Sequence, residues 1–389
     1  MMKSNSLRPR LLQAFTASGA PERAQGLRDR RIVVFGPQSF LAQIHLQRLV
    51  DAGANIVLLI DDQCRELTLH GIPVKSSAAF VAGAARVQDA VLIDFTAQAY
   101  AQVVCHQLGA VTGLERRDLL ELLAAYDAAA VYETVPDNRR LTLARADDWL
   151  ALADRLADDF SRETLYAVLL QRLEYDRSVL RHVNLWGRDE YFGTGAQSDT
   201  FVAGQREHFV DCGAHRGTVV QKLLAATSGR YASIHAFEPD VENYAALQWM
   251  TPSALANFHV HRCAVSDRNE TLRFAQTGTM GSHVARDGNV EVKAVMLDDV
   301  VEKATFIKMD VEGYEPRALR GAARLLATQR PRLAIASYHF AQDLLEVAQV
   351  LDELAPGYVL RLRHHYSYYF DSIFYASPRE DWSPLDSAT

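Results

Sequence analysis

The sequence predicts an α/β protein made of two units, each with a mostly parallel sheet flanked by helices. Short apolar runs typical of buried strands alternate with longer stretches of helical periodicity, once in residues 30–135 and again in 201–389. Between them, residues 140–182 contain almost no Gly or Pro and have Leu and Ala at helical spacing. The length of 389 residues also exceeds one typical domain. Such alternation favours parallel strands joined by right-handed crossovers.

The composition, net charge and cysteine pattern of the chain exclude several classes of protein. With 49% hydrophobic and 23% charged residues and a net charge of −7, the chain can form a sizeable core, and it is not expected to bind nucleic acid non-specifically. No apolar run reaches the roughly 18 residues of a membrane span. The N-terminal stretch has basic residues but no uninterrupted apolar segment, so export is not expected. The four scattered cysteines form no CxxC pair, which indicates a reducing compartment. We expect a cytoplasmic protein with no membrane insertion, and a homodimer is a candidate assembly.

The first unit is preceded by a tail and followed by a helical connector. Residues 1–29 mix Ser, Arg, Pro and Gly and predict a loose N-terminal tail. An α/β domain is then predicted over 30–135, with strands at "RIVVFG", "NIVLLIDD" and "AVLIDF". The helical connector is predicted over 136–200, and its Leu stripe is expected to pack against a domain.

The second unit, 201–389, predicts seven strands. The last two have no helix between them, which favours an open, mostly parallel sheet with an antiparallel hairpin at its edge. Residues 271–298 are an additional β segment. The predicted strands are "HFVDCG", "SIHAFEP", "FHVHRCAVS", "TFIKMD", "RLAIASYH", "YVLRLRHH" and "SIFYAS".

Acidic residues stand at the carboxyl ends of three of these strands: Asp211, Glu238 and Asp310. Ligands of open parallel sheets bind at this edge, near the point where the strand order reverses. Gly213 and Gly217 permit a tight strand-to-helix turn and a close approach of backbone to a ligand. Glu238 is placed to accept hydrogen bonds from ribose hydroxyls. The pattern predicts a nucleoside-like cofactor; the alternative is that Asp211 caps the next helix and the glycines only turn the chain.

Four stretches in this order resemble the motifs of FkbM-type S-adenosylmethionine-dependent methyltransferases. They are "FVDCGAHRGTVVQKL", "IHAFEPDVENYAAL", "VHRCAVSD" and "FIKMDVEGYEPRALRGAARLL". The resemblance covers about 205–377 and implies a class I methyltransferase fold, with S-adenosylmethionine as methyl donor and an oxygen as the usual acceptor.

The resemblance also implies which residues bind the cofactor. The loop after the first strand would surround its methionine end, Glu238 its ribose, and residues 264–266 its adenine. Asp267 has two open roles, reaching the adenine amino group or capping a turn. His215 and Arg216 depart from the small or polar residues expected in this loop. The predicted cofactor-binding residues are Asp211, Gly213, Gly217, Glu238, Ala264, Val265, Ser266 and Asp267.

Catalysis is assigned to Asp310 and His339, which end the fourth and fifth strands. A hydroxyl acceptor gains from a general base, and the two side chains could converge on one acceptor oxygen. The alternative is that Asp310 fixes the local loop or the cofactor's amino group and that His339 is an ordinary hydrogen-bonded histidine. Asp310, Glu312 and His339 could form an oxygen-rich magnesium site, but their spacing does not require one, and the prediction is a site without metal.

Substrate contacts are predicted on four residues, and the segment "GTMGSH" (278–283) is a candidate lid. Imidazole and aromatic groups in "LRHHYSYY" suit stacking on a sugar, although an ordinary hairpin with a polar tip explains them equally well. The candidate substrate residues are His283, Tyr338, His364 and His365.

The stretch "RIVVFGPQSF" departs from a dinucleotide-binding turn. Only Gly36 is present, and Pro37 lacks the amide that would bind a phosphate. Asp61 and Asp62 still end the second strand, the usual place of a ribose-binding acid. This region loosely resembles Rossmann-like domains found beside sugar-modifying enzymes, and a scaffolding or substrate-presenting role is predicted.

The function predicted from these patterns is an S-adenosylmethionine-dependent O-methyltransferase. The resemblance and the polar, aromatic rim indicate an acceptor hydroxyl on a sugar, a glycan or a glycosylated metabolite. The alternative is a non-catalytic binding protein that senses S-adenosylmethionine or a nucleotide.

Overall fold

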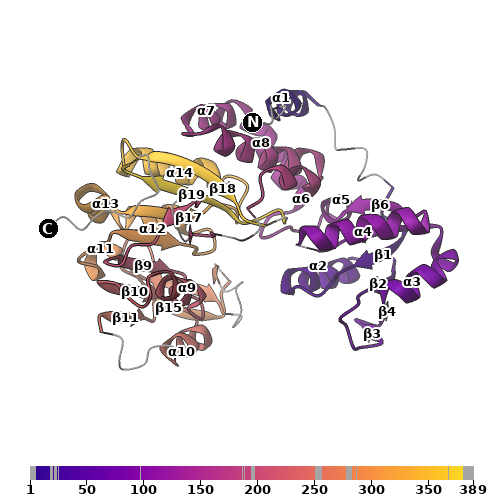
Figure 1. The fold of residues 1–389 in the computed structure, drawn as a ribbon, viewed down its shortest axis with the longest axis horizontal. Coiled ribbons are helices and arrows are strands. Elements are labelled where there is room, and N and C mark those ends of the chain that lie inside the picture. The colour runs from indigo at the N-terminus through magenta and orange to yellow at the C-terminus, as the bar shows by residue number, and fades with distance from the viewer. Residues whose placement is uncertain are drawn as a thin grey trace. The chain divides into compact units, whose positions relative to one another are not determined.

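A computed structural model describes most of residues 6–379 and divides them into two compact units. The first contains the described parts of Met1–Asp147, Glu163–Trp186 and Tyr366–Phe370. The second contains those of Asp148–Arg162, Gly187–His365 and Asp371–Thr389. Figure 1 follows the chain by colour. Residues left undescribed between 6 and 379 are 18–20, 22–23, 25, 97, 186, 188, 194–197, 250–255, 277–282, 286 and 367.

The first unit is built on a six-stranded sheet with the order β3-β4-β2-β1-β5-β6. All neighbouring strands are parallel except β3 and β4, which are antiparallel. The strand order reverses between β1 and β5, since β2 lies on one side of β1 and β5 on the other. The strands are β1 (Arg31–Phe35), β2 (Ile56–Ile60), β3 (Thr68–Leu69), β4 (Ile72–Lys75), β5 (Ala90–Asp94) and β6 (Glu115–Asp118).

Helices cover both faces of this sheet. Alternate residues of β1 face opposite sides: Ile32 and Val34 join a core with α2 and α5, whereas Val33 and Phe35 join one with α3 and α4. Both faces being buried explains why the strands are continuous apolar runs. The helices are α2 (Phe40–Asp51), α3 (Ser77–Gly83), α4 (Ala99–Thr112), α5 (Leu119–Ala125) and α6 (Val135–Ala144).

Two predicted segments differ from expectation. Within the predicted tail, α1 (Arg8–Thr16) is a helix: Pro9 is tolerated in its first turn, and Leu11 and Ala14 are buried at helical spacing. The predicted connector is divided between the two units. Each of its helices α7 (Ala146–Arg155) and α8 (Asp159–Glu174) has residues in both units. The segment that includes the 3-10 turn Arg177–His182 belongs to the first unit.

The second unit is built on a seven-stranded sheet with the order β11-β10-β9-β16-β17-β19-β18. Strands β11 to β17 pair in parallel, and β19 runs antiparallel to both β17 and β18. The order reverses between β9 and β16. The strands are β9 (His208–Cys212), β10 (Ser233–Phe237), β11 (Phe258–His261), β16 (Phe306–Met309), β17 (Arg332–Ala336), β18 (Val359–His364) and β19 (Ser372–Ser377).

Helices α9 and α10 contribute to a core on this sheet through Val220, Leu223 and Leu247, and α14 packs with α12 and α13. The helices are α9 (Thr218–Ala226), α10 (Val241–Trp249), α11 (Leu297–Val300), α12 (Glu315–Arg320), α13 (Ala323–Gln329) and α14 (Asp343–Leu354). Two smaller sheets accompany them, β7-β8 and β12-β15-β13-β14. Their strands are β7 (Phe192–Gly193), β8 (Phe201–Val202), β12 (Ala264–Val265), β13 (Glu270–Ala275), β14 (His283–Val284) and β15 (Val290–Val295).

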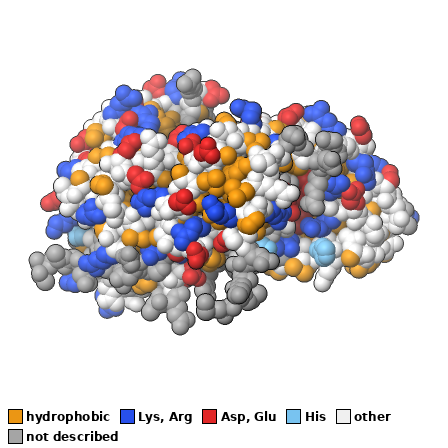
Figure 2. Space-filling view, turned by 90° about the horizontal axis from the view of Figure 1, so that it is seen from above, with side chains coloured by type: hydrophobic (Ala, Val, Ile, Leu, Met, Phe, Trp, Pro, Cys, Tyr) orange, Lys and Arg blue, Asp and Glu red, His pale blue; other side chains and the backbone are white. Residues whose placement is uncertain are grey.

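The predicted strand "FHVHRCAVS" is divided between two sheets. Its first part, β11, pairs with β10 in the large sheet, and its second part, β12, pairs with β15 in the small one. The arrangement as a whole is a mixed α/β fold. In the described chain, no helix is both long enough and apolar enough to cross a membrane. On the face seen in Figure 2, basic and acidic side chains are intermixed.

Candidate functional site

The site lies at the carboxyl edge of the seven-stranded sheet, where the order reverses between β9 and β16. Asp310 follows β16 directly, and its backbone N–H donates to the carbonyl of Cys212 at the end of β9 (3.0 Å). Glu238 follows β10 and His339 lies three residues beyond β17. The parallel pairing of four strands therefore brings these predicted residues to one edge of the sheet.

The β9–α9 loop depends on glycine at two positions. Gly213 and Gly217 have φ of +76° and +82°, the left-handed region that glycine adopts without penalty. At Gly213 a Cβ atom would lie 1.8 Å from the backbone oxygen of Asp310. The N–H groups of Gly213 and Ala214 both donate to the carbonyl of Phe237 (3.0 Å each). Gly213 thus lets the loop approach the strand that carries Asp310.

Asp211 forms a buried ion pair with a lysine that the sequence motifs did not single out. Its Oδ1 lies 3.1 Å from Nζ of Lys308, and the two residues are 0% and 2% exposed. Nζ also donates to the carbonyls of Gly213 (2.8 Å) and Cys212 (3.3 Å). Burial disfavours the ammonium, but Asp211 and Asp310 outweigh it and raise the pKa of Lys308. The pair fixes the start of the loop predicted to surround the cofactor.

Glu238 also stabilises this loop. Its Oε2 accepts the N–H of His215 (2.7 Å), a residue at φ +48°, and its Oε1 accepts the N–H of Asp240 (2.9 Å). Glu238 is only 5% exposed. Burial raises its pKa to about 7, although both backbone hydrogen bonds oppose that shift. Each carboxylate oxygen retains a further lone pair for a ligand hydroxyl.

The predicted adenine-binding residues lie in the smaller sheet. Ala264 and Val265 form β12, and the N–H of Ser266 donates to the carbonyl of Val295 (2.9 Å). Asp267 accepts a hydrogen bond from Nε of Arg317 (2.9 Å), which lowers its pKa. The two roles considered for Asp267 were reaching the adenine amino group and capping a turn. Neither included an ion pair with Arg317.

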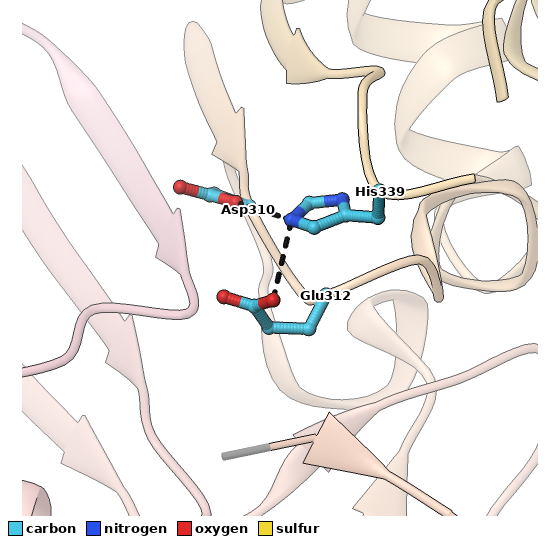
Figure 3. Close-up of side chains that lie close together, drawn as sticks. All are labelled: Asp310, Glu312 and His339. Atoms are coloured by element: carbon cyan, nitrogen blue, oxygen red, sulfur yellow. Dashed lines mark ion pairs between the residues drawn. The ribbon is translucent and has the colours of Figure 1, made fainter. Parts of the chain in front are cut away.

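His339 is surrounded by carboxylates on both ring nitrogens. Nε2 lies 3.4 Å from Oδ1 of Asp310 and 3.4 Å from Oε2 of Glu312, as Figure 3 shows. On the other side, Nδ1 lies 3.6 Å from Oε1 of Glu315 and 3.9 Å from Oδ2 of Asp343. The histidine is 2% exposed. Four acidic groups, two from the segment between β16 and α12, one from α12 and one from α14, thus face one imidazole.

The charges around His339 shift the pKa values of the two predicted catalytic residues, Asp310 and His339, in opposite directions. Burial disfavours the imidazolium, but Glu315, Glu312 and Asp310 outweigh it and raise the pKa of His339 well above its ordinary value. Burial likewise opposes ionisation of Asp310, yet His339 and Lys308 outweigh it and lower its pKa. At neutral pH His339 is therefore a cation and Asp310 a carboxylate. Of the two, Asp310 is the group able to accept a proton.

Comparison with known proteins bears directly on this edge of the sheet. Residues 211–363 match the family model described as the methyltransferase FkbM domain. By this similarity, residues 211–363 are referred to as the FkbM domain. The matched range includes Asp211, Glu238, Asp310 and His339, so the FkbM resemblance inferred from the sequence motifs is confirmed.

Two individual proteins are also similar to this chain. Hexuronic acid methyltransferase AglP of Haloferax volcanii is 26% identical over 151 residues, which cover 37% of this chain and 60% of that protein. The crystal structure of methyltransferase FkbM from Methylobacillus flagellatus KT superposes with a TM-score of 0.75 at 25% identity, covering 95% of this chain and 99% of that one. The second similarity extends over both units.

Several residues around Asp310 were missed by the sequence analysis, and some lie outside the FkbM domain. Tyr191 donates its hydroxyl to Oδ2 of Asp310 (2.9 Å), and Tyr338 donates to Oδ1 (3.3 Å). Tyr338 was predicted, but as a substrate contact. The ring of Tyr191 also lies 5.3 Å from Nζ of Lys308. Burial and the nearby charges of Glu190 and Asp310 raise the pKa of Asp371 well above its ordinary value.

Of the other predicted substrate residues, His365 is joined to the group around Asp310, because the hydroxyl of Tyr375 contacts both His365 and the N–H of Tyr191. His283 is on β14 in the small sheet, and most of the candidate lid lies outside the described residues. His364 and His365 are fully buried, with His364 Nδ1 3.1 Å from the Ser372 hydroxyl and His365 Nε2 2.8 Å from the hydroxyl of Tyr375. Their contact with substrate stays a prediction.

The three residues considered for magnesium do converge in the FkbM domain. One ligand atom from each of Asp310, Glu312 and His339 lies within 4.8 Å of the others, and Glu315, His339 and Asp343 form a second such group. Carboxylates and imidazole are common metal ligands. Coordination would require His339 to lose the proton that its carboxylate neighbours favour. The ion pairs already account for the arrangement of these side chains.

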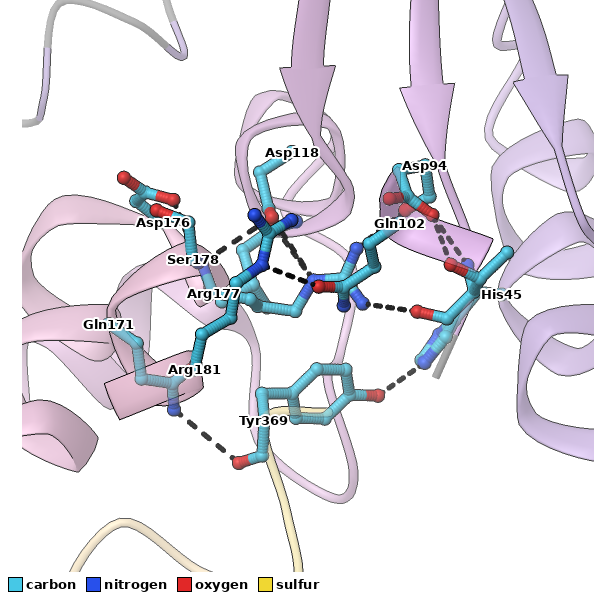
Figure 4. Close-up of polar contacts among 12 residues, drawn as sticks. His45, Asp94, Gln102, Asp118, Gln171, Asp176, Arg177, Ser178, Arg181 and Tyr369 are labelled. Atoms are coloured by element: carbon cyan, nitrogen blue, oxygen red, sulfur yellow. Dashed lines mark hydrogen bonds and ion pairs between the residues drawn. The ribbon is translucent and has the colours of Figure 1, made fainter. Parts of the chain in front are cut away.

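In the first unit, residues from distant parts of the chain occupy the carboxyl edge near β5 and β6 (Figure 4). Arg177, 1% exposed, donates to the Asp94 carbonyl (2.6 Å), the Thr96 carbonyl (3.1 Å) and the carboxylate of Asp118 (2.9 Å). The ring of Tyr368 lies 5.2 Å from its guanidinium carbon. The chain's own polar groups therefore fill the β5 side of the point where strand order reverses.

Proposed function

We propose that the protein transfers a methyl group from S-adenosylmethionine to a hydroxyl of a sugar, a glycan or a glycosylated metabolite. The observation that carries this proposal is the convergence of Glu238, the β9–α9 loop and Asp310 at the edge where the sheet order reverses. The FkbM domain supports methyl transfer. The printed name of AglP, a hexuronic acid methyltransferase, supports a sugar acceptor.

The residues present fit this cofactor. Gly213 lets the β9–α9 loop lie against the backbone of Asp310, because any Cβ there would meet it, and Glu238 offers carboxylate oxygens suited to ribose hydroxyls. The loop around Gly213 and Gly217 would hold the methionine end, with Ala264, Val265 and Ser266 beside the adenine. S-adenosylmethionine supplies an already activated methyl group, so the protein has chiefly to orient the acceptor.

Asp310 is the group proposed to take the proton of the acceptor hydroxyl. It is ionised at neutral pH, and Tyr191 and Tyr338 hold its two oxygens. His339 is proposed to position Asp310 as a cation held between carboxylates, rather than to act as the base. The acceptor oxygen would bond to the methyl carbon as the bond from that carbon to the sulfonium sulfur breaks, which leaves S-adenosylhomocysteine, and the proton of the acceptor would pass to Asp310.

Incubation of the full chain with methyl-labelled S-adenosylmethionine and a panel of uronic acid and neutral glycosides tests the proposal. A labelled methyl ether that requires both protein and glycoside is the expected result. Tight binding of the cofactor with no labelled product from any acceptor class would favour the alternative, a sensor without turnover.

Replacing Glu238 with Gln should weaken S-adenosylmethionine binding and remove its pH dependence. Ribose hydroxyls favour the ionised carboxylate, so the wild-type affinity should rise with pH through about 7, the raised pKa of this group, and binding below it should release a proton. Replacement with Ala should cost about 2–4 kcal/mol of binding free energy, from two charge-assisted hydrogen bonds. Calorimetry from pH 6 to 8 measures both effects.

Glu242→Gln is the matched control, since this exposed carboxylate stands in the first turn of α10. It should leave both affinity and pH dependence unchanged. Equal cofactor affinity in the wild type and Glu238→Ala would place the ribose elsewhere.

A further inference from the structure

The first unit contains a pocket that the proposed methyl transfer does not use. It lies beside the carboxyl ends of β1 and β2 and has a volume of about 260 Å³. Gln38 and Gln43 line it from the β1–α2 segment, and Asp61, Gln63 and Cys64 line it from the segment that ends β2. The volume is below the roughly 300–1,000 Å³ of pockets for drug-sized ligands, so a single ring is the appropriate size of ligand.

Asp61 has an acceptor atom without a partner. Its Oδ1 accepts the N–H groups of Gln63 (2.8 Å) and Cys64 (3.0 Å), which fixes the turn after β2. Its Oδ2 has no hydrogen-bond partner among the described residues, although Asp61 is only 7% exposed. The neighbouring Asp62 differs, because its two oxygens accept the N–H and the hydroxyl of Ser77 (2.7 and 2.6 Å). Buried polar atoms are normally paired, so Asp61 Oδ2 points to a missing donor.

The rest of the lining indicates the chemistry of that donor. Three glutamine side chains can each donate and accept hydrogen bonds, Arg65 and Glu66 add one charge of each sign, and Pro37, Leu69 and Val74 add apolar surface. A carboxylate, several amides and an apolar wall match the hydroxyls and the C–H surface of a sugar ring. Vicinal hydroxyls also occur on the ribose of a nucleotide. Arg65 could meet one phosphate of a nucleotide diphosphate. The turn after β1 would not hold the diphosphate, because Gly36 is followed by Pro37, which has no N–H to offer.

We propose that this pocket binds the ring of a pyranoside, with Asp61 Oδ2 accepting a hydrogen bond from a ring hydroxyl. The site is independent of the methyl-transfer site, and its ligand requires no reaction there. A sugar bound by the first unit gives that unit a recognition role.

Protection of Cys64 from alkylation tests the site in the full-length protein. Cys64 is half-buried, whereas Cys105, Cys212 and Cys263 are buried, so a thiol reagent applied to the native protein selects Cys64. Methyl glycosides of glucose, galactose and glucuronic acid are the probes, with adenosine monophosphate and NAD as the ribose-bearing arm. Saturable protection by at least one pyranoside is expected. Protection by no glycoside, or by the ribose-bearing compounds alone, would overturn the proposal.

Asp61→Asn tests the contact with the ligand while it keeps the hydrogen bonds that hold the turn after β2. The amide oxygen can still accept the N–H groups of Gln63 and Cys64, while the ligand loses its carboxylate acceptor. Pyranoside binding should weaken about 10- to 100-fold, as for loss of a charged hydrogen bond. Asp62→Asn removes the same charge one residue away and should bind normally. Gln38→Ala, from the opposite wall, should weaken binding without touching the turn; unchanged protection in both Asp61→Asn and Gln38→Ala would refute the site.

Discussion

Replacing Asp310 with Asn should lower the turnover of methyl transfer by about 10²–10⁴, the usual contribution of a positioned general base. The substitution keeps the shape of the side chain and leaves one oxygen that can accept from Tyr191 or Tyr338, while the amide nitrogen can only donate to the other hydroxyl. It removes the charge that takes the proton. Affinity for S-adenosylmethionine should change little, because Glu238 and the β9–α9 loop carry that contact. Single-turnover rates, measured with an acceptor identified by the glycoside panel, give the effect on chemistry directly.

Glu312→Gln is the matched control for this substitution. Its carboxylate lies at the same 3.4 Å from Nε2 of His339 as that of Asp310, and both side chains are 21% exposed. If the negative charge of the cluster alone supports the reaction, both variants should lose similar activity. A direct role for Asp310 instead predicts a loss in Glu312→Gln below about tenfold, or about 1.4 kcal/mol. Equal losses would contradict a specific role for Asp310.

The pH profile distinguishes Asp310 from His339. The pKa of Asp310 is lowered and that of His339 is raised, so we expect a wild-type rate measured between pH 6 and 8 to lack the step near pH 6.5 of an ordinary histidine. With Asp310 as base, these two groups contribute no change in the wild-type rate across this range. A rate that increases only in alkaline solution, and loses this increase in His339→Gln, would show that His339 must first lose its proton and acts as the base.

The mixed α/β fold and the strand-end acids could be predicted because both depend on local patterns. A buried parallel strand is a short apolar run, and the first polar residue after it stands at the edge where ligands bind. Glu238 and Asp310 follow β10 and β16 in this way. The break between β11 and β12 was missed because both parts are apolar runs of the same kind, and only their pairing assigns them to different sheets.

Partners distant in sequence could not be predicted by the same reasoning. Tyr191 and Asp310 are 119 residues apart, and His45 and Tyr369, which contact each other in the first unit, are 324 residues apart. No periodic pattern links such positions. Lys308 did offer a signal: a lysine inside the apolar run "FIKMD" needs a buried acid nearby, and Asp211 is that acid.

Replacing Gly213 with Ala should destabilise the second unit by about 2–5 kcal/mol and abolish cofactor binding. Two costs add: an alanine at φ +76° is strained, and its Cβ would lie 1.8 Å from the carbonyl oxygen and 2.9 Å from the carbonyl carbon of Asp310. These are backbone atoms, so no side chain can rotate away, and the loop must separate from β16. Denaturant unfolding and calorimetry with S-adenosylmethionine measure the two consequences.

Gly229→Ala isolates the first cost, the strain of an alanine in the left-handed region. Gly229 has a similar φ of +73°, yet a Cβ there would meet no atom within 4 Å. This variant should lose only the stability that a strained backbone costs, about 1–2 kcal/mol, and should bind S-adenosylmethionine as the wild type does. The difference between the two variants then measures how closely the β9–α9 loop must approach Asp310. If both variants lost the same stability and both kept the cofactor, the contact between Gly213 and Asp310 would have no part in shaping the site.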